Sequence, residues 1–253
     1  MNSSAPPQKL RLDELLVQRG LFASRSRARD AIARGAVQVG GAIATKPGQP
    51  VRADVPIIVD DPAQSYVSRA ALKLIAGLDA FALDPSGKLA VDIGASTGGF
   101  TQVLLERGAS HVLAVDVGHG QLDQRLASNP RVTSLEKTNA RDLTSEHLGG
   151  RRPGFVVSDV SFISLKLALP PVLELAEDGA HCVLLVKPQF EAGREAIGKG
   201  GLLRNPDDAP RIAADLEDWL ARQPGWRPLG IVPSPIEGGD GNKEFLLAGV
   251  KDK

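Results

Sequence analysis

One stretch, LAVDIGASTGGFT at residues 89–101, constrains the fold of this chain more than any other. Residues 89–93 form a short apolar run whose single charge is Asp92, and such a run predicts a fully buried strand. The small residues 94–99 predict a tight turn, and residues 100–107 have a helix-forming composition. A strand, a glycine turn and a helix N-terminus together make a cradle for a nucleotide-like ligand.

Short apolar segments alternate with helical segments through the rest of this region. We expect strands at residues 89–93, 111–115, 131–135, 155–158, 182–186, 227–232 and 244–250. We expect helices at residues 69–81 (with Ser68 as N-cap), 100–107, 165–175 and 206–222. This alternation predicts an α/β domain with a mostly parallel sheet that helices cover on both faces.

Charge is unevenly distributed along the 253 residues, although the formal net charge is zero. Residues 1–50 carry eight Lys and Arg against three acids, which leaves 22 against 27 in the remainder. A basic head on an acidic body indicates a polyanion-binding module attached to a larger domain. A solvated basic helix is the open alternative on charge alone.

The sequence also bears on the compartment. Cys182 is the single cysteine, so no disulfide framework is possible, as is typical of a reducing cytoplasm. No apolar run approaches the roughly 20 residues that a membrane helix needs. The N-terminal MNSSAPPQK lacks the apolar segment of a signal peptide. We therefore expect a cytoplasmic protein that does not span a membrane.

The basic head has an order of elements that can be compared with known modules. Leucines on one face predict a first helix stopped by Gly20, Ser24 reads as the N-cap of a second helix at 25–34, and a hairpin and a last strand follow. With its motifs RLD, SRSRA and IARGAVQVGG, residues 9–60 resemble the S4 RNA-binding domain. The resemblance implies a small α+β fold that binds RNA phosphates. The candidate RNA-binding residues of the whole chain are Arg11, Arg25, Arg27, Arg29, Arg34, Lys46 and Arg69.

We place the domain boundary in the polar, proline-bearing segment DDPAQS. The predicted organisation is a flexible tail at 1–8, the S4-like domain at 9–60, a linker at 61–67 and the second domain at 68–253.

Polar residues follow several predicted strands of the second domain, and the carboxyl ends of such strands form the ligand site in α/β sheets. A dinucleotide would call for G-x-G-x-x-G, whereas this chain has D-x-G-x-S-x-G-G, with an acid before the first glycine. An acid there suits S-adenosylmethionine, with Asp116 on its ribose, and we favour that cofactor over NAD. The candidate cofactor-binding residues are Asp92, Gly94, Ala95, Ser96, Thr97, Gly98, Gly99, Phe100, Asp116, Val117, Asn139 and Asp159.

Four charged residues stand at apolar positions or at strand ends: Lys73, Asp159, Lys187 and Glu244. They match the Lys-Asp-Lys-Glu tetrad of the FtsJ-like ribose methyltransferases. Together with YVSRAALKL, DIGASTGGFT, VDVGHGQL, SDVSFISL, LVKPQFE and GNKEF, they make the chain resemble the TlyA family over nearly its whole length. One departure is Gln64-Ser65-Tyr66, where some members have Arg-Ala-Trp.

The resemblance implies a Rossmann-like class I S-adenosylmethionine-dependent methyltransferase domain that methylates a cytidine ribose 2′-OH in ribosomal RNA. The expected substrate is 23S RNA, and whether 16S RNA is a second substrate stays open. In this scheme Lys187 acts as base or orients the hydroxyl, Asp159 holds Lys187, and Lys73 and Glu244 complete the network. No metal is expected, since the four histidines show no ligand spacing.

Other functions stay open at this point. They are methylation of another RNA such as transfer RNA, a noncatalytic RNA-binding or ribosome-assembly role, and a cytolysin activity, because the TlyA family has carried a haemolysin label. The residues leave the oligomeric state open.

Overall fold

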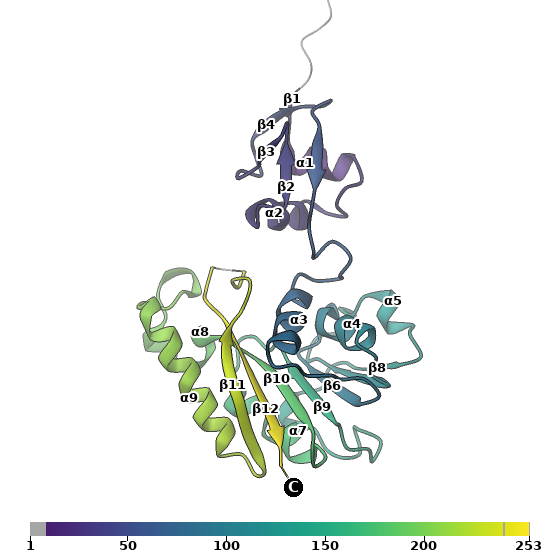
Figure 1. Cartoon of the computed structure of the whole chain (residues 1–253), viewed down its shortest axis with the longest axis vertical. Helices are drawn as coiled ribbons and strands as arrows, with labels where there is room; N and C mark the ends of the chain where they lie inside the picture. The colour runs from purple at the N-terminus through teal and green to yellow at the C-terminus, as the bar shows by residue number, and fades with distance from the viewer. Residues whose placement is uncertain (1–8, 240, 253) are drawn as a thin grey trace, which may run out of the picture. The chain divides into compact units, whose positions relative to one another are not determined.

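The computed structural model describes residues 9–239 and 241–252, so the predicted tail at 1–8 lies outside the described residues. The chain divides into two compact units, one ending at Ser65 and the other beginning at Tyr66 (Figure 1).

Two helices and two small sheets make up the first unit. α1 (Leu12–Gln18) packs against α2 (Arg25–Ala33), and buried Leu12, Leu16 and Ile32 lie in the shared core. One antiparallel sheet has the order β3 (Ala42–Ile43), β2 (Val37–Val39), β5 (Ile57–Val59), and β1 (Lys9–Arg11) pairs with β4 (Pro50–Arg52). The β1–β4 pair was not predicted, because three-residue strands carry too little alternation to be recognised.

Ser24 caps the start of α2 as the sequence predicts. Ser24 Oγ accepts a hydrogen bond from the Arg27 N–H at 3.3 Å, which satisfies one unpaired donor at the helix start. Gly35, after the end of α2, has a φ of 75°, a backbone conformation that glycine adopts without steric cost.

The second unit is built on one seven-stranded sheet. Its order is β11-β12-β10-β9-β6-β7-β8, and the five strands from β10 to β8 run parallel. β12 is antiparallel to β10 and to β11, so the sheet is mixed at one edge. The bounds are β6 (Leu89–Ile93), β7 (His111–Val115), β8 (Val132–Leu135), β9 (Phe155–Ser158), β10 (His181–Val186), β11 (Trp226–Pro233) and β12 (Phe245–Lys251).

Helices cover both faces of this sheet, as predicted (Figure 1). One buried apolar cluster contains side chains of α3 (Ala71–Ala80), α4 (Gly99–Glu106) and α5 (Gln124–Ala127). The opposite cluster contains those of α6 (Leu165–Ala168), α7 (Pro170–Leu175) and α9 (Ala209–Ala221), and the short α8 (Pro188–Glu191) follows β10.

Two helix predictions were wrong in detail. α3 begins at Ala71, and Ala70 rather than Ser68 is its N-cap residue. Ser68 Oγ instead accepts from the Ala70 N–H at 3.2 Å and stabilises the preceding turn. The helix expected at 165–175 is divided at Leu169, because Pro170 has no N–H to continue the first helix.

The sheet order decides where a ligand can bind. β6 lies between β7 and β9, so the chain crosses the sheet in opposite directions from β6. A crevice forms at the carboxyl ends of strands where the order reverses in this way. The glycine turn that follows β6 therefore opens onto this crevice.

Candidate active site and cofactor cleft

The turn after β6 brings backbone segments unusually close together. Gly94 has a φ of 83°, and a Cβ at this position would lie 2.8 Å from the carbonyl oxygen of Asp159. Only glycine therefore allows the end of β6 to approach the end of β9 in this way. The same approach leaves open space on both sides of the turn.

The larger of two cavities here has a volume of about 340 Å³ and apolar walls from Ile93, Val115 and Ile163. Asp116 lines it, held by two backbone donors: the Ser96 N–H donates to Oδ2 at 2.8 Å and the Gly118 N–H to Oδ1 at 2.7 Å. The carboxylate is thus fixed at the rim of the cavity. The predicted residues Val117 and Asn139 also line this cavity.

The smaller cavity has a volume of about 160 Å³ and shares four wall residues with the larger one: Gly94, Ser96, Asp159 and Ser161. The predicted cradle residues Ala95, Thr97, Gly99 and Phe100 line it as well, with Lys187 on its wall. The two cavities therefore form a single two-part cleft. One part is mainly apolar, and the other ends at Asp159 and Lys187, two residues of the predicted tetrad.

Lys187 and Asp159 meet at the shared wall. Lys187 Nζ lies 2.6 Å from Asp159 Oδ1 as an ion pair and donates its directed hydrogen bond to Ser161 Oγ at 2.8 Å. Both charged side chains are largely buried. Ser161 was missed as a site residue, and its position two residues after Asp159 in SDVSFIS is the signal that could have identified it.

Lys73 and Glu244 form the second pair. Lys73 Nζ donates to Glu244 Oε2 at 2.5 Å, and only 7% and 3% of these side chains are exposed. Neither residue lines the two cavities. The pair is therefore a buried contact between the start of α3 and the start of β12.

Strand register brings both pairs to the same edge of the sheet. Val186 is paired with Phe245 in the antiparallel β10–β12 ladder. Lys187, which follows Val186, and Glu244, which precedes Phe245, are therefore neighbours at the same end of the two strands. Asp159 follows Ser158, which is paired with Leu184 in the parallel β9–β10 ladder. Register thus brings Asp159, Lys187 and Glu244 together, and the helix α3 adds Lys73 through its contact with Glu244.

Asp92 does not reach the cleft, although it was predicted to bind the cofactor. It is completely buried, lines neither cavity, and accepts a hydrogen bond from Thr101 Oγ1 at 2.7 Å. Its Oδ1 has no hydrogen-bond partner within the described residues. Burial raises the pKa of Asp92 to about 7, the Thr101 hydrogen bond opposes this, and the negative charges of Asp159 and Asp116 add to it.

Gly98 is the other predicted cradle residue outside both cavities. It has a φ of 98° and lies against Leu126, where a Cβ would not fit. Gly98 therefore serves the packing of the turn on α5 rather than the lining of the cleft.

A loop at the mouth of the larger cavity carries an exposed aromatic ring. Phe162 is 91% exposed with a φ of 66°, and its ring centroid lies 5.1 Å from that of Phe190. Glu191 accepts from Ser164 Oγ at 2.5 Å and from the Leu165 N–H at 2.8 Å. These contacts hold the loop against α8, and burial raises the pKa of Glu191 despite the two hydrogen bonds.

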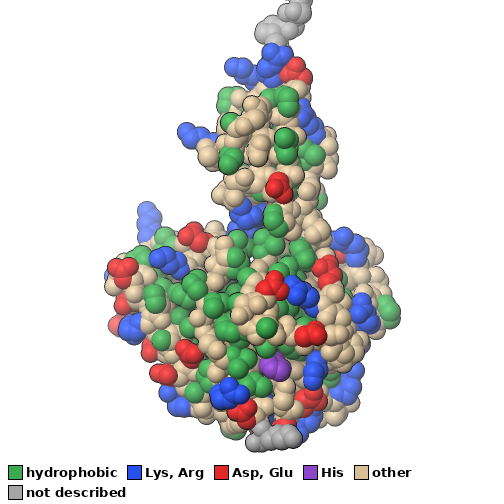
Figure 2. All heavy atoms as spheres, in the orientation of Figure 1, with side chains coloured by type: hydrophobic (Ala, Val, Ile, Leu, Met, Phe, Trp, Pro, Cys, Tyr) green, Lys and Arg blue, Asp and Glu red, His purple; other side chains and the backbone are tan. Residues whose placement is uncertain are grey.

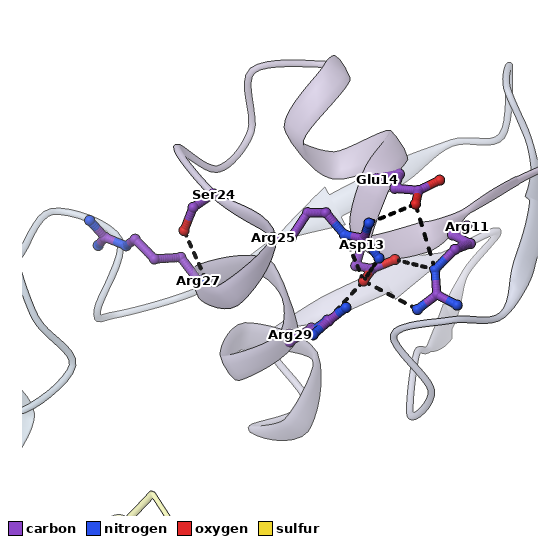
Figure 3. A network of polar contacts seen from close by, with 7 residues as sticks. All are labelled: Arg11, Asp13, Glu14, Ser24, Arg25, Arg27 and Arg29. Atoms are coloured by element: carbon purple, nitrogen blue, oxygen red, sulfur yellow. Dashed lines mark hydrogen bonds and ion pairs between the residues drawn. The ribbon is translucent and has the colours of Figure 1, made fainter.

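The basic residues predicted to bind RNA separate into two groups in the first unit. Arg11, Arg25 and Arg29 converge on the carboxylate of Asp13 (Figure 3). Arg27 Nη2 instead donates to the Ala63 carbonyl at 3.2 Å, and Arg34 pairs with Asp61 at 2.9 Å. Several Lys and Arg side chains are exposed on the visible face of this unit (Figure 2). Lys46 is exposed on the loop before β4, and Arg69 belongs to the second unit.

The sheet and the two-part cleft are those of the Rossmann-like methyltransferases, the class that uses S-adenosylmethionine. The family model of the FtsJ-like methyltransferases matches residues 66–251, and that of the S4 domain matches residues 10–57. The chain belongs to the TlyA family of FtsJ-like methyltransferases with an S4 domain.

Three relatives illustrate this similarity. The 16S/23S rRNA (cytidine-2′-O)-methyltransferase TlyA of Mycobacterium tuberculosis is 45% identical over 95% of this chain and 89% of its own length. Hemolysin A of Brachyspira hyodysenteriae is 38% identical over 94% of this chain and 98% of its own. A solved structure from Streptococcus thermophilus, named as a hemolysin candidate, has a TM-score of 0.75 and 39% identity, covering 98% of this chain and 90% of that one.

Proposed function

We propose that the protein transfers a methyl group from S-adenosylmethionine to the 2′-OH of a cytidine ribose in ribosomal RNA. The observation that carries this proposal is the ion pair of Lys187 and Asp159 at the wall shared by the two cavities. The name of the mycobacterial relative supports the choice of ribosomal RNA. A ribosomal substrate would place the reaction in the cytoplasm.

The residues of the cleft fit this cofactor. The apolar part suits an adenine ring, and the fixed carboxylate of Asp116 suits ribose hydroxyls. The smaller part, with the Gly94–Thr97 backbone, suits the amino acid end. S-adenosylmethionine supplies an electrophilic methyl group when it is bound.

The chain itself must activate the acceptor. A ribose 2′-OH is a weak nucleophile and has to lose its proton as it attacks. Lys187 Nζ, on the wall of the smaller cavity, would orient this hydroxyl or accept its proton. Asp159 and Ser161 hold Lys187 Nζ in place from two directions. Most of the rate acceleration would come from such alignment.

The buried pair of Lys73 and Glu244 would act through position rather than contact. It joins α3 to the first residue before β12, next to Lys187 in the sheet register. A buried pair of opposite charges fixes the geometry of the two elements that it joins, because each charge is costly without its partner.

RNA would be held by sites in both units. The exposed ring of Phe162 at the cleft mouth offers a surface on which a base can stack. The arginines of the first unit would bind phosphates, for which the planar guanidinium group is well suited.

The direct test is to incubate the protein with labelled S-adenosylmethionine and purified 50S or 30S ribosomal subunits, with bulk transfer RNA as a comparison. We expect label in ribosomal RNA, at a cytidine whose 2′-O-methylation is then located by mapping. Cofactor binding without methyl incorporation into any ribosomal RNA would overturn the proposal. Incorporation of label into transfer RNA alone would show that transfer RNA, and not ribosomal RNA, is the substrate.

Some relatives carry the name hemolysin, and the membrane lysis that this name implies can be tested separately. Across the described residues, no helix is long and apolar enough to cross a membrane. Leakage of dye from phospholipid vesicles treated with pure protein, if equal to that of a known cytolysin, would support a membrane activity. We expect no leakage above the buffer control.

A further inference from the structure

Asp13 is a buried carboxylate at the centre of an otherwise exposed basic surface. Its side chain is 0% exposed, yet it lies in the first turn of α1, where an acid would ordinarily face solvent. Three guanidinium groups bond to it: Arg11 Nε at 3.1 Å, Arg25 Nη2 at 3.0 Å and Arg29 Nε at 2.9 Å (Figure 3). We call these three arginines the arginine cluster.

The Asp13 side chain is held in its ionised form by its neighbours. Burial raises the pKa of Asp13, but the hydrogen bonds from Arg11, Arg29 and Arg25 outweigh it and hold this pKa far below its usual range. Because the three guanidinium groups cover the carboxylate, it cannot contact a ligand directly. Its negative charge is therefore hidden beneath positive groups that face outward.

The same residue fixes the segments that carry the cations. Arg11 belongs to β1, while Arg25 and Arg29 belong to α2. The Asp13 N–H donates to the Pro47 carbonyl at 2.9 Å, so the loop that bears exposed Lys46 is attached to the start of α1. Asp13 thus connects three segments that each present a predicted RNA-binding cation.

Gly48 lies directly against the guanidinium group of Arg11. A Cβ at position 48 would lie 3.0 Å from both Nη1 and Nη2 of Arg11. A residue without a side chain leaves room for the guanidinium group between the loop and Asp13. The position of Arg11 is therefore set by packing as well as by charge.

The arginines of the cluster differ in what they leave free. Arg25 gives Nε and Nη2 to Asp13 and Nη1 to Glu14, at 2.8 Å in the last case. Arg29 gives only Nε to Asp13, and within the described residues its Nη1 and Nη2 have no partner. Its side chain is 52% exposed. Arg29 consequently presents its two terminal amino groups to solvent in a fixed orientation.

We propose that Asp13 is a positioning residue: it holds three guanidinium groups as a single phosphate-binding surface, on which Arg29 presents its free amino edge. A free arginine loses side-chain entropy when it binds a phosphate, and an arginine already held in place loses less. The ligand is the sugar–phosphate backbone of RNA, so this inference rests on the proposed function.

The change in RNA affinity caused by Asp13→Asn distinguishes a role in positioning from a simple effect of net charge. Asp13→Asn removes a negative charge beneath the surface, so charge alone predicts tighter RNA binding. Positioning predicts weaker binding, by about five- to tenfold, because a neutral amide no longer holds three guanidinium groups. Asp54→Asn is the matched control, since Asp54 pairs with exposed Arg52 in the same unit and lies outside the cluster.

The experiment measures binding of the full chain to deproteinised 23S ribosomal RNA by filter binding, from about 50 to 200 mM KCl. We expect Asp13→Asn to bind more weakly with a shallower salt dependence, and Asp54→Asn to bind as wild type or more tightly. Equal or tighter binding by folded Asp13→Asn would overturn the inference and leave the proposed function intact. Wild-type protein that neither binds nor methylates ribosomal RNA would instead overturn the proposed function.

A second variant keeps the test decisive if Asp13→Asn does not fold. Arg29→Lys retains the charge at an exposed position but loses the Nε bond to Asp13 and the planar amino edge. We expect several-fold weaker RNA binding, with circular dichroism and the unfolding midpoint unchanged. Arg52→Lys is its control and should leave the affinity unchanged. An affinity equal to wild type in Arg29→Lys would contradict the proposed role.

Discussion

Gly77 of α3 lies so close to Val183 of β10 that a Cβ at position 77 would come within 2.8 Å of Val183 Cγ1. This contact sets how near α3 lies to the sheet. Lys73 is four residues earlier and thus on the same helical face. The absence of a side chain at Gly77 therefore allows Lys73 to reach Glu244 at the edge of the sheet.

Gly77→Ala should accordingly lower activity more than stability. The added methyl overpacks the interface, while alanine favours the helix, so we expect the free energy of unfolding to fall by no more than about 2 kcal/mol. Displacement of α3 would separate Lys73 from Glu244, and we expect methyl transfer to fall by at least about tenfold. Single-turnover methylation and urea unfolding measure the two effects. Ala80→Ser, on the exposed end of α3, is the control, and equal losses in both variants would contradict this account.

Lys187→Ala should abolish methyl transfer and leave cofactor binding largely intact. Lys187 Nζ contacts Asp159 and Ser161 at the wall of the smaller cavity, and loss of a group that orients the hydroxyl or accepts its proton costs about 10² to 10⁴ in rate. Calorimetric titration with S-adenosylmethionine and a methylation assay separate binding from transfer. Lys166→Ala, an exposed lysine on α6, should behave as wild type. Retained transfer in Lys187→Ala would remove this residue from the chemistry.

Phe162→Ala should reduce use of RNA without affecting the cofactor. A base stacked on an aromatic ring contributes about 1–3 kcal/mol, so we expect kcat/KM for ribosomal RNA to fall by about 5- to 150-fold. The Kd for S-adenosylmethionine should change little. Phe162→Trp should restore most of the activity, and Leu167→Ala removes another exposed apolar side chain as a control. No difference between Phe162→Ala and Leu167→Ala would count against stacking.

Asp92 predicts a specific pH dependence of stability. Its folded pKa of about 7 lies above the ordinary value, so the folded state binds a proton more tightly than the unfolded state. The stabilisation is fully present below about pH 4 and is lost as the pH rises through about 7. Asp92→Asn removes this dependence, so its unfolding midpoint relative to wild type should increase between about pH 4 and 7. Asp218→Asn, at an exposed position on α9, should show a constant difference, and a constant difference for Asp92→Asn would refute the assignment.

Arg34 should behave as a structural residue although the sequence predicts RNA binding. Its side chain is 16% exposed and donates two hydrogen bonds to Asp61, whose side chain is 2% exposed. Arg34→Ala leaves a buried carboxylate without its partner, and we expect the free energy of unfolding to fall by about 3 kcal/mol. The salt dependence of RNA binding should not change. A shallower salt dependence in a fully folded variant would show that Arg34 contacts phosphate.

Much of the local structure could be predicted from the sequence alone. The bounds of β6 and β7 are those expected from their apolar runs, and Ser24 caps α2 as its position predicts. Such features depend on residues within one or two turns of each other, where side-chain pattern and backbone preference act directly. The four charged residues of the tetrad were likewise visible, because each stands at an apolar position or at the end of a predicted strand.

Only the tertiary structure decides which of those charged side chains form pairs and which are buried. Lys73 meets Glu244 across 171 positions because α3 packs closely at Gly77 and β12 runs antiparallel to β10. Asp13 reads in the sequence as an ordinary first-turn acid, and only the folded first unit buries it among three arginines. The sequence by itself determined the elements, the glycine turn and the identity of the charged groups. The burial and pairing of those groups depend on strand register and helix packing, which arise from contacts between segments far apart in the chain.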